Sequence, residues 1–122
     1  MICPSNPFVS VDPILAVAGI RQHLEKRRVP VVAVSPIIAG AAIKGPTAKM
    51  MQELDIPNDA VAVAHHYRGL LDGFVLDQQD AALGDDVAAL GVEVSVAQTL
   101  MVTLADRIDL AEKVLQFTNR LG

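Results

Sequence analysis

The 122-residue chain is long enough for one compact domain with its own core and too short for two. Apolar residues make up 52% of it, but no stretch of 18 uncharged apolar residues could span a membrane. The net charge of −4 excludes a protein that binds nucleic acid through a basic surface. The single cysteine, Cys3, allows no internal disulfide and predicts a cytoplasmic location. We therefore expect neither nucleic acid nor a membrane among its partners.

The chain alternates short β-branched segments with segments of helical periodicity. Four parallel strands are predicted, near residues 1–3, 30–34, 73–77 and 92–96. Helices are predicted between and after them, the first with Asp12 as its N-cap and a break near Gly19: Pro13–Arg28, Thr47–Leu54, 59–67, Gln79–Leu90 and Thr103–Leu121. This order predicts an α/β fold, an open parallel sheet in a Rossmann-like arrangement of three αβα layers. We expect residues 1–122 to form a single domain, and the very short first strand suggests the later part of a longer protein.

Small and polar residues are concentrated at one predicted edge of this sheet. The loops that follow the four strands are 4–12, 35–45, 77–79 and 97–103, and they are rich in Ser, Asn, Gly, Gln and Thr. The loops at the opposite edge are ordinary charged or glycine turns. Because ligands of open parallel sheets bind beyond the carboxyl ends of the strands, we expect the site at the first edge.

The segment 31–51 has the order strand, small-residue loop, basic residue and helix start. Unpaired backbone N–H groups at a helix start attract anions, and Lys44 would add a positive charge before Gly45, Pro46 and Thr47. Pro46 fits the first helical position, where its missing N–H costs nothing. The pattern is typical of a phosphate-binding loop, although a plain surface loop with a solvated lysine has the same composition.

Several motifs of the chain resemble the 2-phospho-L-lactate transferase family, which acts in coenzyme F420 biosynthesis. The residues that carry the resemblance are spread over essentially the whole chain: Pro4-Ser5-Asn6-Pro7, Ser10, Pro13-Ile14-Leu15, Ser35-Pro36-Ile37, Lys44-Gly45-Pro46, His66-Tyr67 and Thr99-Leu100-Met101. It covers only the C-terminal part of the family, and the glycine-rich opening motif of the family is absent from this sequence. The chain is thus expected to be the C-terminal lobe of a longer transferase.

The resemblance implies a Mg²⁺-dependent transfer of a phospholactyl or phosphoenolpyruvyl group. The donor would be a guanosine diphosphate conjugate, the acceptor the hydroxyl of the deazaflavin Fo, and the leaving group GMP. The resemblance also implies a homodimer. Family members often carry an acid between two threonines where this chain has Gln98, and a neutral amide cannot neutralise Mg²⁺.

Eight residues are the candidates for substrate or nucleotide binding: Ser5, Asn6, Ser10, Ser35, Lys44, Gly45, Thr47 and Asp77. Lys44 would interact with the charge that builds on the departing phosphate. Asp77 ends a buried strand and would contact substrate. The alternative for the serines and the asparagine is that they satisfy the backbone of their own loops. No catalytic or metal-binding residue is assigned.

The adjacent histidines His65 and His66 point to different faces of a helix and are poor joint metal ligands.

Two further alternatives for the whole chain remain open. The chain could instead be a non-catalytic regulator of the same fold that binds sugar nucleotides. It could also be an oligomerisation module whose apolar surface completes an assembly.

Overall fold

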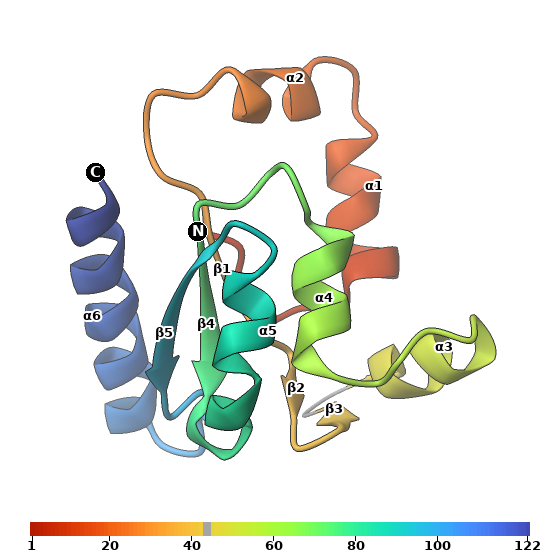
Figure 1. The fold of residues 1–122 in the computed structure, drawn as a ribbon, viewed down its shortest axis with the longest axis vertical. Coiled ribbons are helices and arrows are strands. Elements are labelled where there is room, and N and C mark those ends of the chain that lie inside the picture. The colour runs from red at the N-terminus through yellow and green to blue at the C-terminus, as the bar shows by residue number, and fades with distance from the viewer. Residues whose placement is uncertain (43–44) are drawn as a thin grey trace.

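A three-stranded parallel sheet forms the centre of the computed structural model, which describes residues 1–42 and 45–122. Its strands lie in the order β1 (Val32–Val34), β4 (Gly73–Asp77) and β5 (Glu93–Ala97), as Figure 1 shows. Ile2 adds one parallel bridge to Ala33 beyond β1. Three predicted strands are thus confirmed within two residues, and the first is reduced to this bridge. Pro4 follows it closely and has no N–H to continue a ladder.

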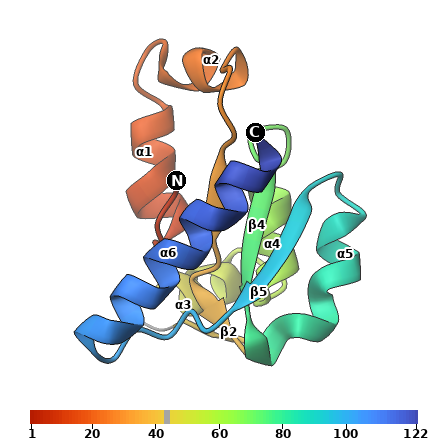
Figure 2. The same cartoon turned by 90° about the vertical axis from the view of Figure 1, so that its left-hand side faces the viewer.

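The two faces of the sheet are covered by different helices, which gives the predicted αβα layers. Alternate residues of a strand point to opposite faces: Ala33 and Phe74 pack into one core cluster, and Val34 and Val75 into the other. Helices α1 (Asp12–Leu15), α4 (Ala60–His66) and α5 (Gly84–Ala88) lie on the first side and α6 (Leu104–Leu121) on the second (Figure 2). The fold class is therefore the predicted Rossmann-like α/β arrangement.

Helix α6 (Leu104–Leu121) packs closely against β4. Thr103 caps it, with Thr103 Oγ1 accepting from Asp106 N at 3.1 Å and the Asp106 carboxylate accepting from Thr103 N at 2.8 Å. A Cβ on Gly73 would lie 2.7 Å from a ring carbon of Phe117, so only glycine fits there at this separation. Both ends of the predicted helix are confirmed.

The predicted helix over Pro13–Arg28 is two short helices. These are α1 (Asp12–Leu15) and α2 (Ile20–Glu25), separated at Gly19, whose φ is +87°. Asp12 was predicted as an N-cap, but it is the first residue of α1, and no side chain caps that helix. The loop before it contains the turn η1 (Pro7–Val11), capped by Asn6, whose Oδ1 accepts from Phe8 N and Val9 N.

The small-residue loop after β1 contains a hairpin that the sequence did not predict. Strands β2 (Ile37–Ile38) and β3 (Ala41–Ala42) pair antiparallel around Ala39 and Gly40, both with positive φ. Asp80 stabilises this turn because its carboxylate accepts from Ala39 N at 3.0 Å. Positive φ at two successive residues usually requires Asn or Gly, so Ala39 gave no turn signal.

The remaining helices follow the predicted pattern with shifted ends. Helix α3 spans Thr47–Glu53, so Pro46 precedes the first helical residue instead of occupying it. Helix α4 (Ala60–His66) begins after Asp59, whose side chain caps it by accepting from Ala62 N. The predicted helix over Gln79–Leu90 is a 3₁₀ turn, η2 (Gln78–Leu83), followed by α5 (Gly84–Ala88). In the part of the chain described, no helix is long and apolar enough to cross a membrane.

Candidate functional site

A cavity of about 310 Å³ lies at the carboxyl edge of the sheet, where the sequence places a ligand. It is lined by residues from three loops, which follow Ile2, β1 and β5, and by one residue of α6. These lining residues are Pro4, Ser5, Asn6, Pro36, Thr99, Met101 and Arg107. The arrowheads of β4 and β5 both point to this edge (Figure 1). The parallel sheet thus brings together segments that are up to about a hundred residues apart in the sequence.

Ser5 and Asn6, both predicted to bind substrate, line this cavity in different ways. The Asn6 side chain is buried and holds its own loop: Oδ1 accepts from Phe8 N at 2.9 Å, and Nδ2 donates to Met50 Sδ at 3.3 Å. Ser5 is half-buried, and its hydroxyl has no hydrogen-bond partner among the described residues. Ser5 therefore offers a polar group to a ligand, while Asn6 shapes the wall.

Asp77 positions the loop that forms the far wall of the cavity. Its carboxylate is 1% exposed, and Oδ2 accepts from both the backbone N and the hydroxyl of Thr99, at 2.9 and 3.0 Å. The other oxygen accepts from Gln79 N at 2.9 Å. Both oxygens are thus engaged inside the chain and hold the Thr99 segment in place, and the expected contact of Asp77 with substrate stays a prediction.

Ser35 has a similar internal role on the opposite wall. It is fully buried, its Oγ donates to Ile37 O at 2.9 Å, and the same oxygen accepts from Ile37 N at 3.2 Å. These bonds close the turn that carries Pro36 into the cavity. Pro36 is consequently held in place by the residue that precedes it.

The other four candidates lie apart from this cavity or outside the described residues. Lys44 falls outside the described residues. Gly45 has a φ of +71°, Ser10 is exposed in η1, and Thr47 is buried in the first turn of α3. Since none of these three lines the cavity, the predicted phosphate-binding loop at α3 stays a prediction.

Arg107 is the residue that sequence analysis missed. It lies in the first turns of α6 and is one of the residues that line the cavity, and its side chain ends in a guanidinium with five N–H donors. The one available signal was the capping pair Thr103 and Asp106, which fixes where α6 begins and hence where Arg107 lies. Sequence position alone did not show that the start of α6 lies at the same cavity as the loop that contains Ser5.

Asp106, beside Arg107, is held as a carboxylate. The backbone N–H groups of Thr103 and Val102 donate to it and lower its pKa below the usual value. Gln98 donates from Nε2 to Asp106 Oδ1 at 3.4 Å and to Leu100 O at 3.2 Å. A carboxylate in place of Gln98 would repel the Asp106 carboxylate, whereas the neutral amide of Gln98 donates a hydrogen bond to it.

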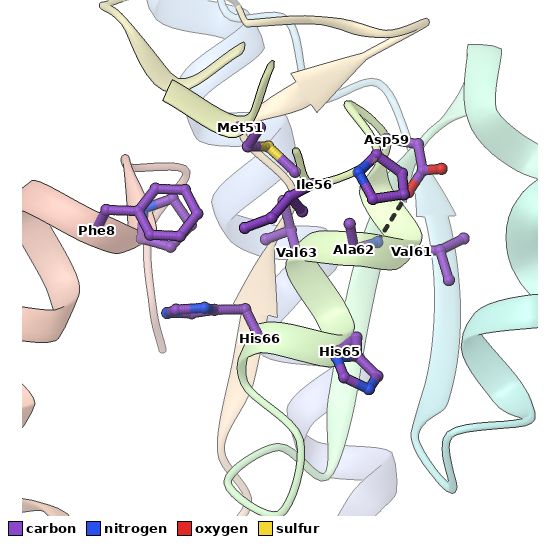
Figure 3. A pocket seen from close by; sticks show the side chains of 11 residues that line it. Phe8, Met51, Ile56, Asp59, Val61, Ala62, Val63, His65 and His66 are labelled. Atoms are coloured by element: carbon purple, nitrogen blue, oxygen red, sulfur yellow. Dashed lines mark hydrogen bonds between the residues drawn. The ribbon is translucent and has the colours of Figure 1, made fainter. Parts of the chain in front are cut away.

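A second cavity, of about 340 Å³, lies between η1, α3 and α4 and is mostly apolar. Figure 3 shows Phe8, Met51 and Ile56 around it, with the imidazoles of His65 and His66 pointing in different directions, as expected of neighbouring residues on a helix. His66 Nε2 lies 2.8 Å from Asp12 Oδ1, so this imidazole ties α4 to α1. No ligand is assigned to this cavity.

The carboxylates near the first cavity do not suit the binding of a magnesium ion. The carboxylates of Asp77 and Asp106 are occupied by N–H and O–H donors of the chain. Over residues 1–42 and 45–122, no three His, Cys, Asp or Glu side chains are close enough to hold a metal. The Mg²⁺ dependence implied by the resemblance therefore remains an expectation, and no step is assigned to the ion.

Comparison with known proteins identifies the relatives of the chain. A 2-phospho-L-lactate transferase of Methanosarcina mazei is 41% identical over 116 residues, which are 95% of this chain and 38% of that protein. A phosphoenolpyruvate transferase of Streptomyces griseus is 36% identical over 119 residues (97% and 37%). A 2-phospho-L-lactate transferase of Methanocaldococcus jannaschii is 32% identical over 121 residues (99% and 37%). The chain thus spans under two fifths of the length of these relatives.

The family comparison covers most of the same stretch. The model of the family described as 2-phospho-L-lactate transferase CofD matches residues 1–100, which include every segment lining the cavity except Met101 and Arg107. The predicted resemblance is confirmed by this match and by the relatives. The chain belongs to the 2-phospho-L-lactate transferase CofD family.

Proposed function

We propose that the chain is the nucleotide- and phosphate-binding part of a transferase of coenzyme F420 biosynthesis. The transferase moves a phospholactyl or phosphoenolpyruvyl group from a guanosine diphosphate conjugate to the hydroxyl of Fo and releases GMP. The observation that carries this proposal is the cavity at the carboxyl edge, with Ser5 and Arg107 on its wall. Membership of the family and the names of the relatives support the choice of reaction.

The cavity walls match the needs of a phosphate-bearing ligand. Arg107 supplies a positive charge and paired donors that fit two phosphate oxygens. The Ser5 hydroxyl donates from the opposite loop, and Asp77 keeps the Thr99 wall in place. The apolar parts of Pro4, Pro36 and Met101 would face a base or ribose. Lys44, outside the described residues, is a further candidate for a phosphate oxygen.

The proposed transfer replaces a phosphoanhydride linkage of the donor by a phosphodiester linkage in the product. The acceptor hydroxyl oxygen bonds to the phosphorus of the phospholactyl group, and the diphosphate P–O bond breaks, so that GMP leaves with the bonding electrons. Arg107 would bind the phosphate of the departing GMP, where negative charge increases during the step. No described residue is assigned to take the proton of the acceptor hydroxyl. We accordingly expect the 122-residue chain alone to bind nucleotide without catalysing transfer.

Calorimetric titration of the chain with GMP tests this function. Arg107→Ala removes a charge-assisted contact, which is worth about 1.5–3 kcal/mol, so the dissociation constant should rise roughly tenfold or more. Arg107→Lys should retain part of the affinity. Arg21→Ala is the matched control, because Arg21 is an exposed arginine that pairs with Glu25 on α2, away from the cavity. Equal affinity for the Arg107→Ala and Arg21→Ala variants would contradict the proposed role of the cavity.

The non-catalytic alternative makes a different prediction about which ligands the chain binds. A regulator of the same fold would bind nucleotide but would have no use for Fo. Binding of Fo by the chain only when GMP or GDP is present would favour the transferase. Tight binding of a sugar nucleotide in preference to GMP would favour the regulator.

A further inference from the structure

The hairpin β2–β3 turns through a backbone conformation that its sequence does not favour. Ala39 and Gly40 have φ angles of +47° and +76°. A two-residue turn with both φ angles positive is usually built from Asn-Gly, Asp-Gly or Gly-Gly. Glycine adopts a positive φ without strain, whereas the Cβ of alanine is crowded against the backbone there. Strained backbone of this kind persists only where the surrounding structure imposes it, and it is often found at functional sites.

Two side chains from distant parts of the chain hold this turn. The Asp80 carboxylate is 7% exposed and accepts from Ala39 N, which lies 3.2 Å from Oδ1 and 3.0 Å from Oδ2. Asn58 Nδ2 donates to the carbonyl oxygen of the next residue, Gly40. The contact with Asp80 is the stronger one, because its acceptor is charged and buried. Asp80 is therefore the main support of the strained residue.

Strand β2 connects the turn to the candidate cavity. Pro36 lines the cavity and is followed directly by the two buried residues of β2. Ser35 holds the start of the strand, since its Oγ accepts from Ile37 N and donates to Ile37 O. Asp80 holds the end of the strand at Ala39 N. Because β2 spans only about 7 Å, a displacement of its end also displaces Pro36.

We propose that Asp80 is a positioning residue of the nucleotide site. It holds Ala39 at its positive φ and thereby fixes the part of the cavity wall that Pro36 forms. Asp80 is not among the residues that line the cavity, so it acts through the hairpin. Asp77, three residues earlier, holds the Thr99 wall. The segment after β4 thus fixes two opposite walls of the cavity. This inference rests on the proposed function, because it takes the ligand between these walls to be a guanosine nucleotide.

Calorimetric titration with GMP, well below the melting temperature of each variant, tests this role. Asp80→Ala should weaken GMP binding about fivefold or more, because the turn is then free to relax to a less strained conformation. Asp80→Asn keeps an acceptor oxygen for Ala39 N and should weaken binding less. Asp86→Ala is the matched control, because it removes the same charge from an exposed site on α5, and it should leave the affinity unchanged.

A glycine at position 39 should rescue the loss. Ala39→Gly alone should leave the affinity for GMP unchanged, since glycine adopts the same turn without strain. The double variant Ala39→Gly/Asp80→Ala should recover most of the affinity that Asp80→Ala loses, because glycine needs no support at a positive φ. A purely global loss of stability would not be corrected in this way. Equal GMP affinity for Asp80→Ala and Asp86→Ala, or no recovery in the double variant, would overturn the positioning role.

Hydrogen exchange without nucleotide separates this inference from the proposed function. The Ile37 amide donates to Ser35 Oγ beside Pro36, so its exchange rate reports how firmly that wall is held. Exchange at Ile37 should be faster in Asp80→Ala and slow again in the double variant. The Thr99 amide, which Asp77 holds, should be unaffected. Unchanged exchange at Ile37 in Asp80→Ala would overturn this inference alone, whereas failure of the unsubstituted chain to bind GMP would overturn the proposed function.

Discussion

Replacement of Asp77 by asparagine should destabilise the chain although it removes only one charge and no volume. The carboxylate accepts three hydrogen bonds in a fully buried position, from Gln79 N, Thr99 N and Thr99 Oγ1. An amide has one acceptor oxygen, so its NH₂ group must face a backbone N–H on one side. Whichever way the amide lies, at least one buried N–H loses its charged acceptor. That loss costs about 1.5–3 kcal/mol, and the melting temperature should fall by roughly 6–12 °C.

Urea denaturation of the Asp77→Asn, Asp86→Asn and Thr99→Val variants measures this cost. Asp86 is exposed on α5, so its substitution removes the same charge without a buried hydrogen bond and should change the unfolding free energy by less than about 0.5 kcal/mol. The double variant Asp77→Asn/Thr99→Val should lose less than the sum of the single losses, because both act on one contact. The reasoning is refuted if Asp77→Asn costs no more than Asp86→Asn. The GMP affinity of Asp77→Asn should also fall, since the Thr99 wall moves.

Two further substitutions test the packing and the electrostatics of the core. Gly73→Ala places a methyl group 2.7 Å from the Phe117 ring, so it should destabilise the chain by about 1–3 kcal/mol in urea, and Phe117→Leu should recover part of that loss. The buried hydroxyl of Tyr67 has no hydrogen-bond partner among the residues that the structure describes, and burial, with the nearby Asp12 charge, raises its pKa above the usual value of 10. The folded state therefore holds this proton more tightly than the unfolded state, so stability should be full below pH 10 and decline as the pH rises above it. Absorbance at 295 nm follows this single tyrosine directly, and Tyr67→Phe should abolish that decline.

The layers of the fold and the edge that holds the cavity follow from the sequence because their signals are local. The β-branched segments gave β1, β4 and β5, and the parallel order of strands and helices placed Ser5, Pro36 and Thr99 at one edge. The hairpin β2–β3 was missed because Ala39 adopts a positive φ only with the support of Asp80, which lies 41 residues away. A contact between residues so far apart in the sequence cannot be predicted from the residues of the turn alone.

The candidate site was predicted less completely, for the same physical reason. Ser35 and Asp77 were chosen as polar residues at strand ends, but their buried side chains are engaged by Ile37 and Thr99. Arg107 comes from a helix that crosses the other face of the sheet, so only the three-dimensional packing shows that it reaches the Ser5 loop. The prediction that concerns Lys44 lies outside the described residues.

The central claim is that a guanosine nucleotide binds in the cavity at the carboxyl edge of the sheet. Amide chemical shifts of the ¹⁵N-labelled chain during titration with GMP test it most directly, because each loop reports separately. We predict saturable shifts concentrated at Ser5, Asn6, Thr99 and Arg107, with residues at the opposite edge, such as Asp72 and Glu93, unchanged. Saturable shifts at that opposite edge, or no shifts at millimolar GMP, would contradict the claim.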